Sequence, residues 1–480
     1  MRGAVAAGHP LTAEAGARVL AAGGNAVDAC VGAAFVSWVC ESPLTGPGGG
    51  GFMLVHGARE GRTRVFDFFV AVPRAASAAA GELLRLEVDF DGDTQQVFHT
   101  GAAAVAVPGT ALGLEAAHRQ FGSVPWAELV APAAELAREG VELTPAQGYL
   151  HRILDGLLRH SPEGDAMYGA GGRPYRAGER FAVPELAETL ERIGVEGARA
   201  LYRGELARRL VEHVQAGGGA LTLEDLAGYR VIRRRPVSVE YRGHEFRSNP
   251  PPSSGGLLVA YGLKALGAAA PSPEALVAAM EAQDAVRGPA FVRGLERGGA
   301  AVRLLSGTTH ISVVDARGDA ASLSASLGSG SGVVVPGTGI HLNNMLGEAD
   351  LREHARPGER LTSMMAPSLV LKNGHPRLVI GSAGSARLRG AILQVVVNVV
   401  ANEMGVEGAV EAPRLHAEEG VVYCEDAAVA DRLEQLGKSV VRFKRQNLFF
   451  GGVSAVEVQP DGHLAAAGDP RRGGAGVVVA

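Results

Sequence analysis

Hydrophobic and polar residues follow two different patterns along this chain, and the change falls near residue 308. Before it, apolar residues recur at helical spacing over long stretches, most clearly in 107–160 and 186–215. After it, alternating apolar and polar segments come in pairs. The pattern predicts a helix-rich first part and a second part built on β-hairpins.

Two helices are predicted near the start of the chain. Thr12 is expected to be the N-cap of a helix that runs through Ala22 and stops at Gly23-Gly24. Asn25 is expected to cap a second helix, through about Cys40.

Three turn dipeptides mark the predicted hairpins of the second part. The paired segments are 309–315 and 320–327 around Arg317-Gly318, 368–372 and 376–381 around Asn373-Gly374, and 452–459 and 463–468 around Asp461-Gly462. Asn-Gly and Asp-Gly are strong hairpin signals, because both residues accept positive φ. Three hairpins with flanking helices fit two antiparallel sheets enclosed between helices.

Composition narrows the class of protein. The 480 residues are 46% hydrophobic and 20% charged, which excludes a disordered chain. No linker divides the sequence, so we expect one large unit. With a net charge of −5 and no basic stripe, a nucleic-acid partner is not expected.

Localisation and cofactors are predicted from the N-terminus, the apolar runs and the cysteines. The first motif follows within ten residues of Met1, which leaves no room for a signal peptide and predicts a cytoplasmic protein. The apolar runs 31–40 and 392–401 are too short or interrupted to cross a bilayer, so no membrane partner is expected. The three cysteines lack metal-ligand spacing and are expected in the core, and no metal or cofactor is predicted. These residues are Cys30, Cys40 and Cys424.

The candidate nucleophile lies in the tetrapeptide Gly307-Thr308-Thr309-His310, at the mouth of a predicted strand. A threonine hydroxyl is a weak nucleophile without a base, and cutting the Gly307–Thr308 bond would free the α-amino group of Thr308 for that role. Glycine on the leaving side permits a strained peptide. On the tetrapeptide alone, the simpler interpretation is that Gly-Thr-Thr only opens a strand.

A series of short motifs around this tetrapeptide favours the nucleophile. In chain order, the motifs are Gly8-His9-Pro10-Leu11, Gly23-Gly24-Asn25-Ala26-Val27-Asp28-Ala29, Gly46-Pro47-Gly48-Gly49-Gly50-Gly51-Phe52, Val107-Pro108-Gly109, Pro250-Pro251-Pro252-Ser253-Ser254-Gly255-Gly256, Gly339-Ile340-His341-Leu342-Asn343-Asn344, Thr362-Ser363-Met364, Gly381-Ser382-Ala383-Gly384-Ser385 and Gly468-Asp469-Pro470-Arg471. Their types and order resemble the γ-glutamyltransferase (glutathione hydrolase) family of N-terminal-nucleophile hydrolases. The resemblance implies an α/β (α+β) fold, a four-layer αββα sandwich with two antiparallel sheets. It also implies that a large segment, 1–307, and a small segment, 308–480, form one unit as a heterodimer after cleavage; whether such pairs dimerise further stays open.

The resemblance also implies a role for each site residue. Thr308 attacks the amide carbonyl, and its freed amine handles the proton. The backbone of Gly384 and Ser385, where the family has two glycines, supplies the oxyanion donors. The residues implied in substrate binding are Ser326, Glu348, Thr362 and Ser363.

Two departures from the family bear on the substrate. Where the family has an arginine for the substrate's α-carboxylate, directly after Asp-Phe, this chain has Phe69, so the clamp is absent unless Arg74 or another arginine replaces it. The segments 287–307 and 344–362 are short, which implies an open site without a lid. Hydrolysis is therefore expected to exceed transfer.

Other catalytic motifs are poorly supported. Gly46-x-Gly48-x-x-Gly51 matches the dinucleotide-binding pattern but leads into a predicted strand instead of a helix. The sequence thus predicts a self-processing threonine amide hydrolase that cleaves γ-glutamyl amides of small molecules. The alternatives are an acylase for another carboxyacyl amide, similar to cephalosporin acylases, and an uncut, inactive homologue that acts as a binding protein.

Overall fold

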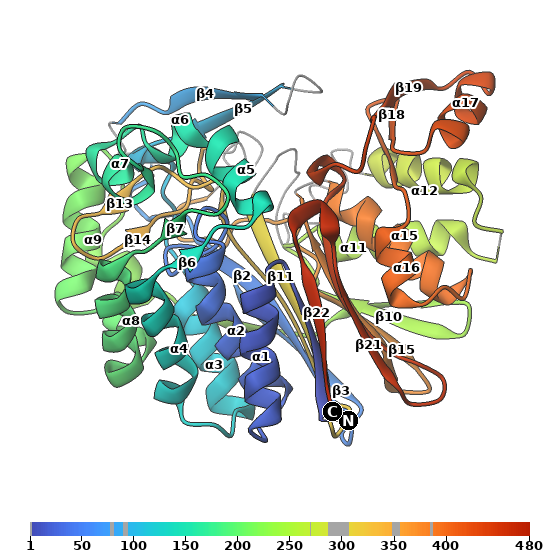
Figure 1. Cartoon of the computed structure of the whole chain (residues 1–480), viewed down its shortest axis with the longest axis horizontal. Coiled ribbons are helices and arrows are strands. Elements are labelled where there is room, and N and C mark those ends of the chain that lie inside the picture. The colour runs from blue at the N-terminus through green and yellow to red at the C-terminus, as the bar shows by residue number, and fades with distance from the viewer. Residues whose placement is uncertain are drawn as a thin grey trace.

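The computed structural model describes residues 2–76, 81–89, 95–268, 270–286, 307–347, 356–384 and 387–480. Two sheets lie face to face at the centre of the molecule, and helices cover the outer face of each (Figure 1). Both sheets are antiparallel throughout. The predicted αββα sandwich is therefore confirmed.

The first sheet has seven strands drawn from both parts of the chain. In spatial order they are β22 (Ala475–Val479), β1 (Gly3–Ala7), β11 (Gly307–Asp315), β12 (Ala320–Gly328), β2 (Gly50–Gly57), β3 (Arg62–Phe68) and β8 (Ile232–Arg234). β11 pairs with β1 on one edge and β12 on the other, and its register shifts between Gly307 and Thr309. The strand that carries the candidate nucleophile is thus held on both sides.

The second sheet has six strands, of which four follow residue 308. In spatial order they are β21 (Leu464–Gly468), β20 (Gly452–Val458), β16 (His375–Ala383), β15 (Ser368–Lys372), β10 (His244–Ser248) and β9 (Val237–Tyr241). All three predicted hairpins form, as β11–β12, β15–β16 and β20–β21. Asn373 and Gly374 have φ of 52° and 81°, the left-handed values that a tight hairpin turn requires.

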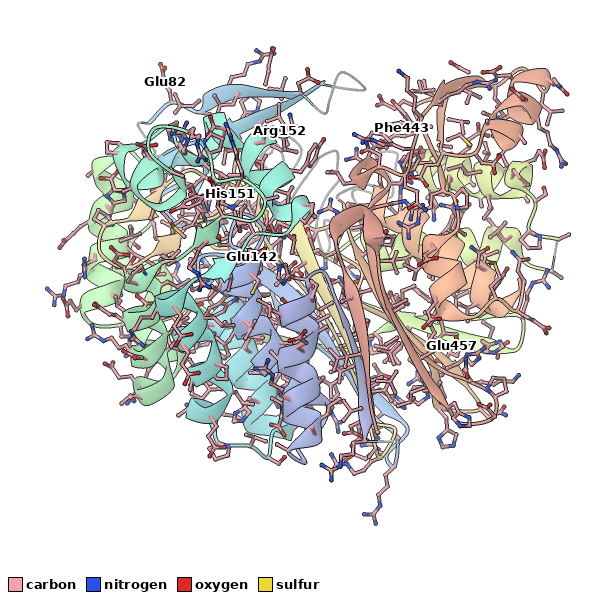
Figure 2. All side chains as sticks on the ribbon, viewed as in Figure 1. Glu82, Glu142, His151, Arg152, Phe443 and Glu457 are labelled. Carbon is pink, nitrogen blue, oxygen red and sulfur yellow. The ribbon has the colours of Figure 1, made fainter. Side chains whose placement is uncertain are left out.

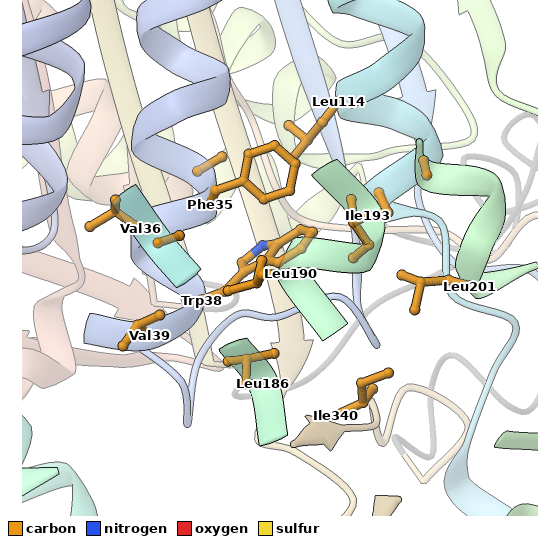
Figure 3. Packing of buried hydrophobic residues seen from close by; sticks show 14 of the residues in the cluster. Phe35, Val36, Trp38, Val39, Leu114, Leu186, Leu190, Ile193, Leu201 and Ile340 are labelled. Carbon is orange, nitrogen blue, oxygen red and sulfur yellow. The ribbon is translucent and has the colours of Figure 1, made fainter. Parts of the chain in front are cut away.

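Helices form the two outer layers. On the first sheet lie α1 (Pro10–Ala21), α2 (Ala26–Cys40), α3 (Thr110–Phe121), α4 (Trp126–Glu139) and α8 (Pro184–Glu196); on the second lie α11 (Gly255–Leu266), α12 (Pro273–Ala285), α15 (Leu388–Val400) and α16 (Val406–Glu411). α2 is buried on every side: the rings of Phe35 and Trp38 are 4.7 Å apart and pack against Leu190 and Ile193 of α8 (Figure 3). A separate, smaller cluster fills the space between the sheets, with Leu54 among its members.

Shorter elements complete the chain. The helices are α5 (Pro145–Ile153), α6 (Asp155–Leu158), α7 (Pro162–Tyr168), α9 (Glu205–Ala216), α10 (Leu223–Gly228) and α17 (Ala427–Gln435). The strands are β4 (Leu84–Asp89), β5 (Gln95–Thr100), β6 (Val141–Glu142), β7 (Arg180–Phe181), β13 (Val334–Val335), β14 (Ile340–His341), β17 (Leu415–Glu418), β18 (Val421–Cys424) and β19 (Ser439–Arg442). Among the described residues, none of the helices combines the length and the apolar character needed to cross a bilayer.

One predicted cap is wrong and one is confirmed. α1 begins at Pro10, capped by His9, whose side chain accepts a hydrogen bond from the backbone of Leu11. Thr12 lies inside the helix, because proline at the first position suits a helix start and the Thr12 hydroxyl is engaged elsewhere. Asn25 caps α2 as predicted and forms a capping box with Asp28. All three cysteines are buried and free, as expected.

Candidate active site

Thr308 lies at the start of β11, where the two sheets face each other. Two residues along the strand, the ring of His310 bonds Ser324 at 2.8 Å and lies so close to Gly381 of β16 that a Cβ there would overlap it. Side chains two apart share a face of a strand, so Thr308 also faces the second sheet, near the end of β16. Thr308 is 1% exposed, and its Oγ1 has no hydrogen-bond partner within the described structure.

His310 connects the sheets and is not placed as a base for Thr308. Burial lowers the pKa of its imidazole to about 3, so the ring is neutral at physiological pH. Its second nitrogen bonds the Ser312 hydroxyl at 3.0 Å, which occupies it within the core.

Gly384 follows β16 directly, with a conformation that only glycine adopts readily. Its φ is +121°, and a Cβ would lie 2.6 Å from the Cα of Gly451. The next residue, Ser385, lies outside the described residues. The predicted oxyanion turn therefore has one described member, at the end of the strand that Thr308 faces.

The residues predicted to bind substrate have different environments. The Ser326 hydroxyl, on β12, accepts from the Gly328 backbone at 2.8 Å. Ser363 Oγ accepts from the Met365 backbone at 3.0 Å, whereas the Oγ1 of its neighbour Thr362 is buried without a hydrogen-bond partner in the described structure. Glu348 lies outside the described residues.

The Ser253-Ser254-Gly255 motif holds the Thr362-Ser363 segment in place. The Ser253 hydroxyl and the Ser254 backbone donate to the Ser363 carbonyl at 2.8 and 2.9 Å. A Cβ on Gly255 would overlap the Met364 carbonyl. This motif is therefore a support for the site, built on close backbone approach.

Sequence reasoning missed Glu41, which follows α2 directly. Its carboxylate is buried and accepts hydrogen bonds from the hydroxyls of Thr309 and Thr12 at 2.7 and 3.0 Å. Burial raises the pKa of Glu41 to about 7, while the two hydroxyls and nearby Arg472 lower it in part. Gly8 leaves room for this carboxylate, since a Cβ there would lie 2.7 Å from it. The available signal was a lone acid at the end of an apolar run.

Phe69, which stands in place of the family's arginine, is part of the core. It is 2% exposed and stacks on Phe52 with ring centroids 5.6 Å apart. Arg360 is close, but its guanidinium donates to the Phe69 carbonyl at 2.5 Å and lies 3.4 Å from the carboxylate of Asp67. Arg74 is exposed. Neither arginine takes over the position of the missing clamp.

The glycine run of 46–51 has a packing role. A Cβ on Gly50 would lie 2.7 Å from the Val70 backbone, and one on Gly49 or Gly51 would overlap carbonyls of β12. The run leads directly into β2. The run is the start of a strand with close backbone contacts. It therefore does not open a helix, as a dinucleotide-binding motif would. The described residues contain no cluster of metal-ligating side chains.

The four-layer sandwich, with a threonine opening a central strand, is the architecture of N-terminal-nucleophile hydrolases. The family model described as gamma-glutamyltranspeptidase matches residues 12–287 and 281–479. The chain therefore belongs to the gamma-glutamyltranspeptidase family.

Relatives in this family carry two kinds of name. The chain is 35% identical to the acylase ACY 1 proenzyme of Pseudomonas sp. (strain SE83), over 100% of this chain and 94% of that protein. It is 32% identical to the glutathione hydrolase proenzyme of Pseudomonas aeruginosa, over 99% and 94%. The solved cephalosporin acylase of Bacillus halodurans superposes with a TM-score of 0.85 at 26% identity, over 99% and 95%.

Proposed function

We propose that this chain cuts itself before Thr308 and then hydrolyses amides of carboxyl-bearing acyl groups, with Thr308 as nucleophile. The observation that carries the proposal is the buried, unpartnered Oγ1 of Thr308 at the start of a central strand. Leaving a buried hydroxyl without a partner costs stability, so such a group at the start of a central strand calls for a functional explanation. Both Pseudomonas relatives above are named as proenzymes, which supports processing.

In the proposed mechanism, Thr308 Oγ1 attacks the amide carbonyl while the freed α-amine accepts the proton. The backbone at Gly384 and Ser385 stabilises the oxyanion. The amine returns the proton to the leaving nitrogen, and water then releases the acyl group from Thr308. Glu41 acts indirectly, because it accepts a hydrogen bond from Thr309, the residue that follows the nucleophile in β11.

Two acyl groups are candidates, and they differ in the α-amine. A γ-glutamyl group, predicted by the family resemblance, carries an α-carboxylate that needs a cation. A glutaryl-type group keeps a carboxylate at the same distance from the amide carbonyl and lacks only the α-amine. Phe69, buried on Phe52, removes the family's cation for either carboxylate, so the support for the second, acylase-like specificity is that relatives are named as acylases.

The decisive experiment joins intact-mass analysis to steady-state kinetics on γ-glutamyl and glutaryl p-nitroanilides. The wild type should separate into chains 1–307 and 308–480, Thr308→Ala should stay whole and inactive, and Thr308→Ser should cut and work more slowly. Glu14→Gln, at an exposed position of α1, is the control and should cut and turn over like the wild type. A wild-type chain that stays whole after long incubation, with no amide cleaved, would support the binding-protein alternative instead.

A further inference from the structure

A pocket of about 250 Å³ opens where α5 meets two late segments of the chain, 445–448 and 470–472. Tyr149 of α5 lines one side, and Arg445 and Arg472 line the other. In Figure 2, the labels His151 and Arg152 locate α5, and the label Phe443 locates the chain just before segment 445–448. The pocket is therefore formed by both parts of the chain.

Two other arginines at this corner are paired with carboxylates. Arg414 lies 2.6 Å from one carboxylate oxygen of Asp469, and Arg471 bonds the other oxygen at 3.2 Å. Arg471 also forms a two-pronged bond with Glu425. The backbone N–H of Val453 also donates a hydrogen bond to the Asp469 carboxylate, at 2.9 Å. The carboxylates here are thus used by other groups.

Within the described part of the chain, Arg472 has no such partner. Within the described residues its side chain makes no hydrogen bond or ion pair, and its Nε is buried and unsatisfied. Burial lowers the pKa of Arg472 to about 10, against the fields of Asp469 and Glu41, so the group stays charged at neutral pH. The oxygens of Glu41 already accept two hydroxyls.

The unpaired guanidinium lies beside the predicted oxyanion turn. Its Nη2 is 3.7 Å from the position that a Cβ on Gly384 would occupy. Arg387, whose backbone bonds the Gly384 carbonyl at 3.2 Å, adds a second positive charge near Arg472, and its own Nε donates to the Phe449 carbonyl at 2.6 Å. Two arginines, Arg387 and Arg472, therefore lie close to Gly384.

A desolvated cation without a partner is costly, whereas pairing it with an anion recovers a charge-assisted hydrogen bond. We propose that Arg472 binds a carboxylate of the amide substrate in this pocket. The inference rests on the proposed amide hydrolysis. In it, Arg472 provides the cation that is missing where Phe69 replaces the family's arginine. The carboxylate can belong to the acyl group or to the leaving amine.

Matched substrates separate these two sources. The first pair tests the acyl side: glutaryl p-nitroanilide carries an acyl carboxylate, and butyryl p-nitroanilide lacks it. The second pair tests the amine side: glutaryl p-nitroanilide is compared with the same anilide bearing a carboxylate on its ring. The wild type should prefer the carboxylate-bearing member of one pair by about 10- to 100-fold in kcat/KM, mainly through KM. Arg472→Gln should reduce that preference to about 3-fold or less, and Arg472→Lys should restore part of it.

The control is Arg18→Gln, which removes a 76% exposed arginine on α1 and should leave both preferences unchanged. An equal fall in kcat on all substrates would assign Arg472 to the oxyanion and overturn the proposal, as would unchanged preferences in folded Arg472→Gln. Glutarate binding, measured by calorimetry, gives a readout independent of turnover. If glutarate binds about tenfold more weakly to Arg472→Gln while no amide is cleaved, carboxylate binding by Arg472 is supported and the proposed hydrolysis is refuted. Equal binding of glutarate to both proteins refutes carboxylate binding by Arg472.

Discussion

Replacing Glu41 with glutamine should change how stability depends on pH. Burial raises the Glu41 pKa from 4.5 to about 7. Since one pKa unit is worth about 1.4 kcal/mol, the folded state disfavours the ionised form by about 3 kcal/mol. Below pH 4.5 the carboxyl is protonated in both folded and unfolded chains, and its contribution is intact. As pH rises to about 7 the unfolded chain releases the proton first, so the free energy of unfolding decreases.

Urea unfolding at several pH values, in a Thr308→Ala background that keeps one chain, measures this effect. Between pH 4 and pH 8, the parent should lose about 3 kcal/mol more than the Glu41→Gln variant, whose side chain stays neutral. Glu14→Gln, which changes an exposed carboxylate of α1, is the control and should follow the parent. Parallel pH profiles for the parent and Glu41→Gln would refute the argument from burial.

Three further substitutions test the geometry of the site. Gly384→Val should lower kcat by about a hundredfold or more, because its Cβ would lie 2.6 Å from Gly451, and turnover measured on folded protein checks this. Phe69→Arg should destabilise the protein by about 3–5 kcal/mol, because it replaces a buried ring with a charge. In the fraction that folds, a lower KM for γ-glutamyl p-nitroanilide would show that the arginine clamp has been restored. An unchanged KM would show that it has not. Gly8→Ala should slow self-cleavage, since its Cβ would lie 2.7 Å from the Glu41 carboxylate, and a time course of intact masses reports the rate.

The sequence predicted the hairpins well because their determinants are local. Asn373 and Gly374 encode a turn whose positive φ values few other residues accept, and alternation supplies the flanking strands. The first helix cap was predicted wrongly because Thr12 satisfies its hydroxyl through Glu41, 29 residues away. No local rule foresees that contact.

The site was predicted in part for the same reason. Thr308 and Gly384 belong to motifs with a recognisable order, so the family resemblance identifies them. The roles proposed for Glu41 and Arg472 rest on burial beside groups distant in the chain, which appears only once both sheets are assembled. A charge in a sequence does not reveal whether its partner is water, a side chain or a substrate.

The order of strands in the first sheet bears on how the two segments would behave once separated at Gly307. β1 lies between β22 and β11, so a strand of the first segment is inserted between two strands of the second. Dissociation would break both ladders and expose the cores on either side. The two pieces should therefore not exchange between molecules under native conditions. Mixed preparations of differently tagged enzyme should keep their original pairings until they are denatured.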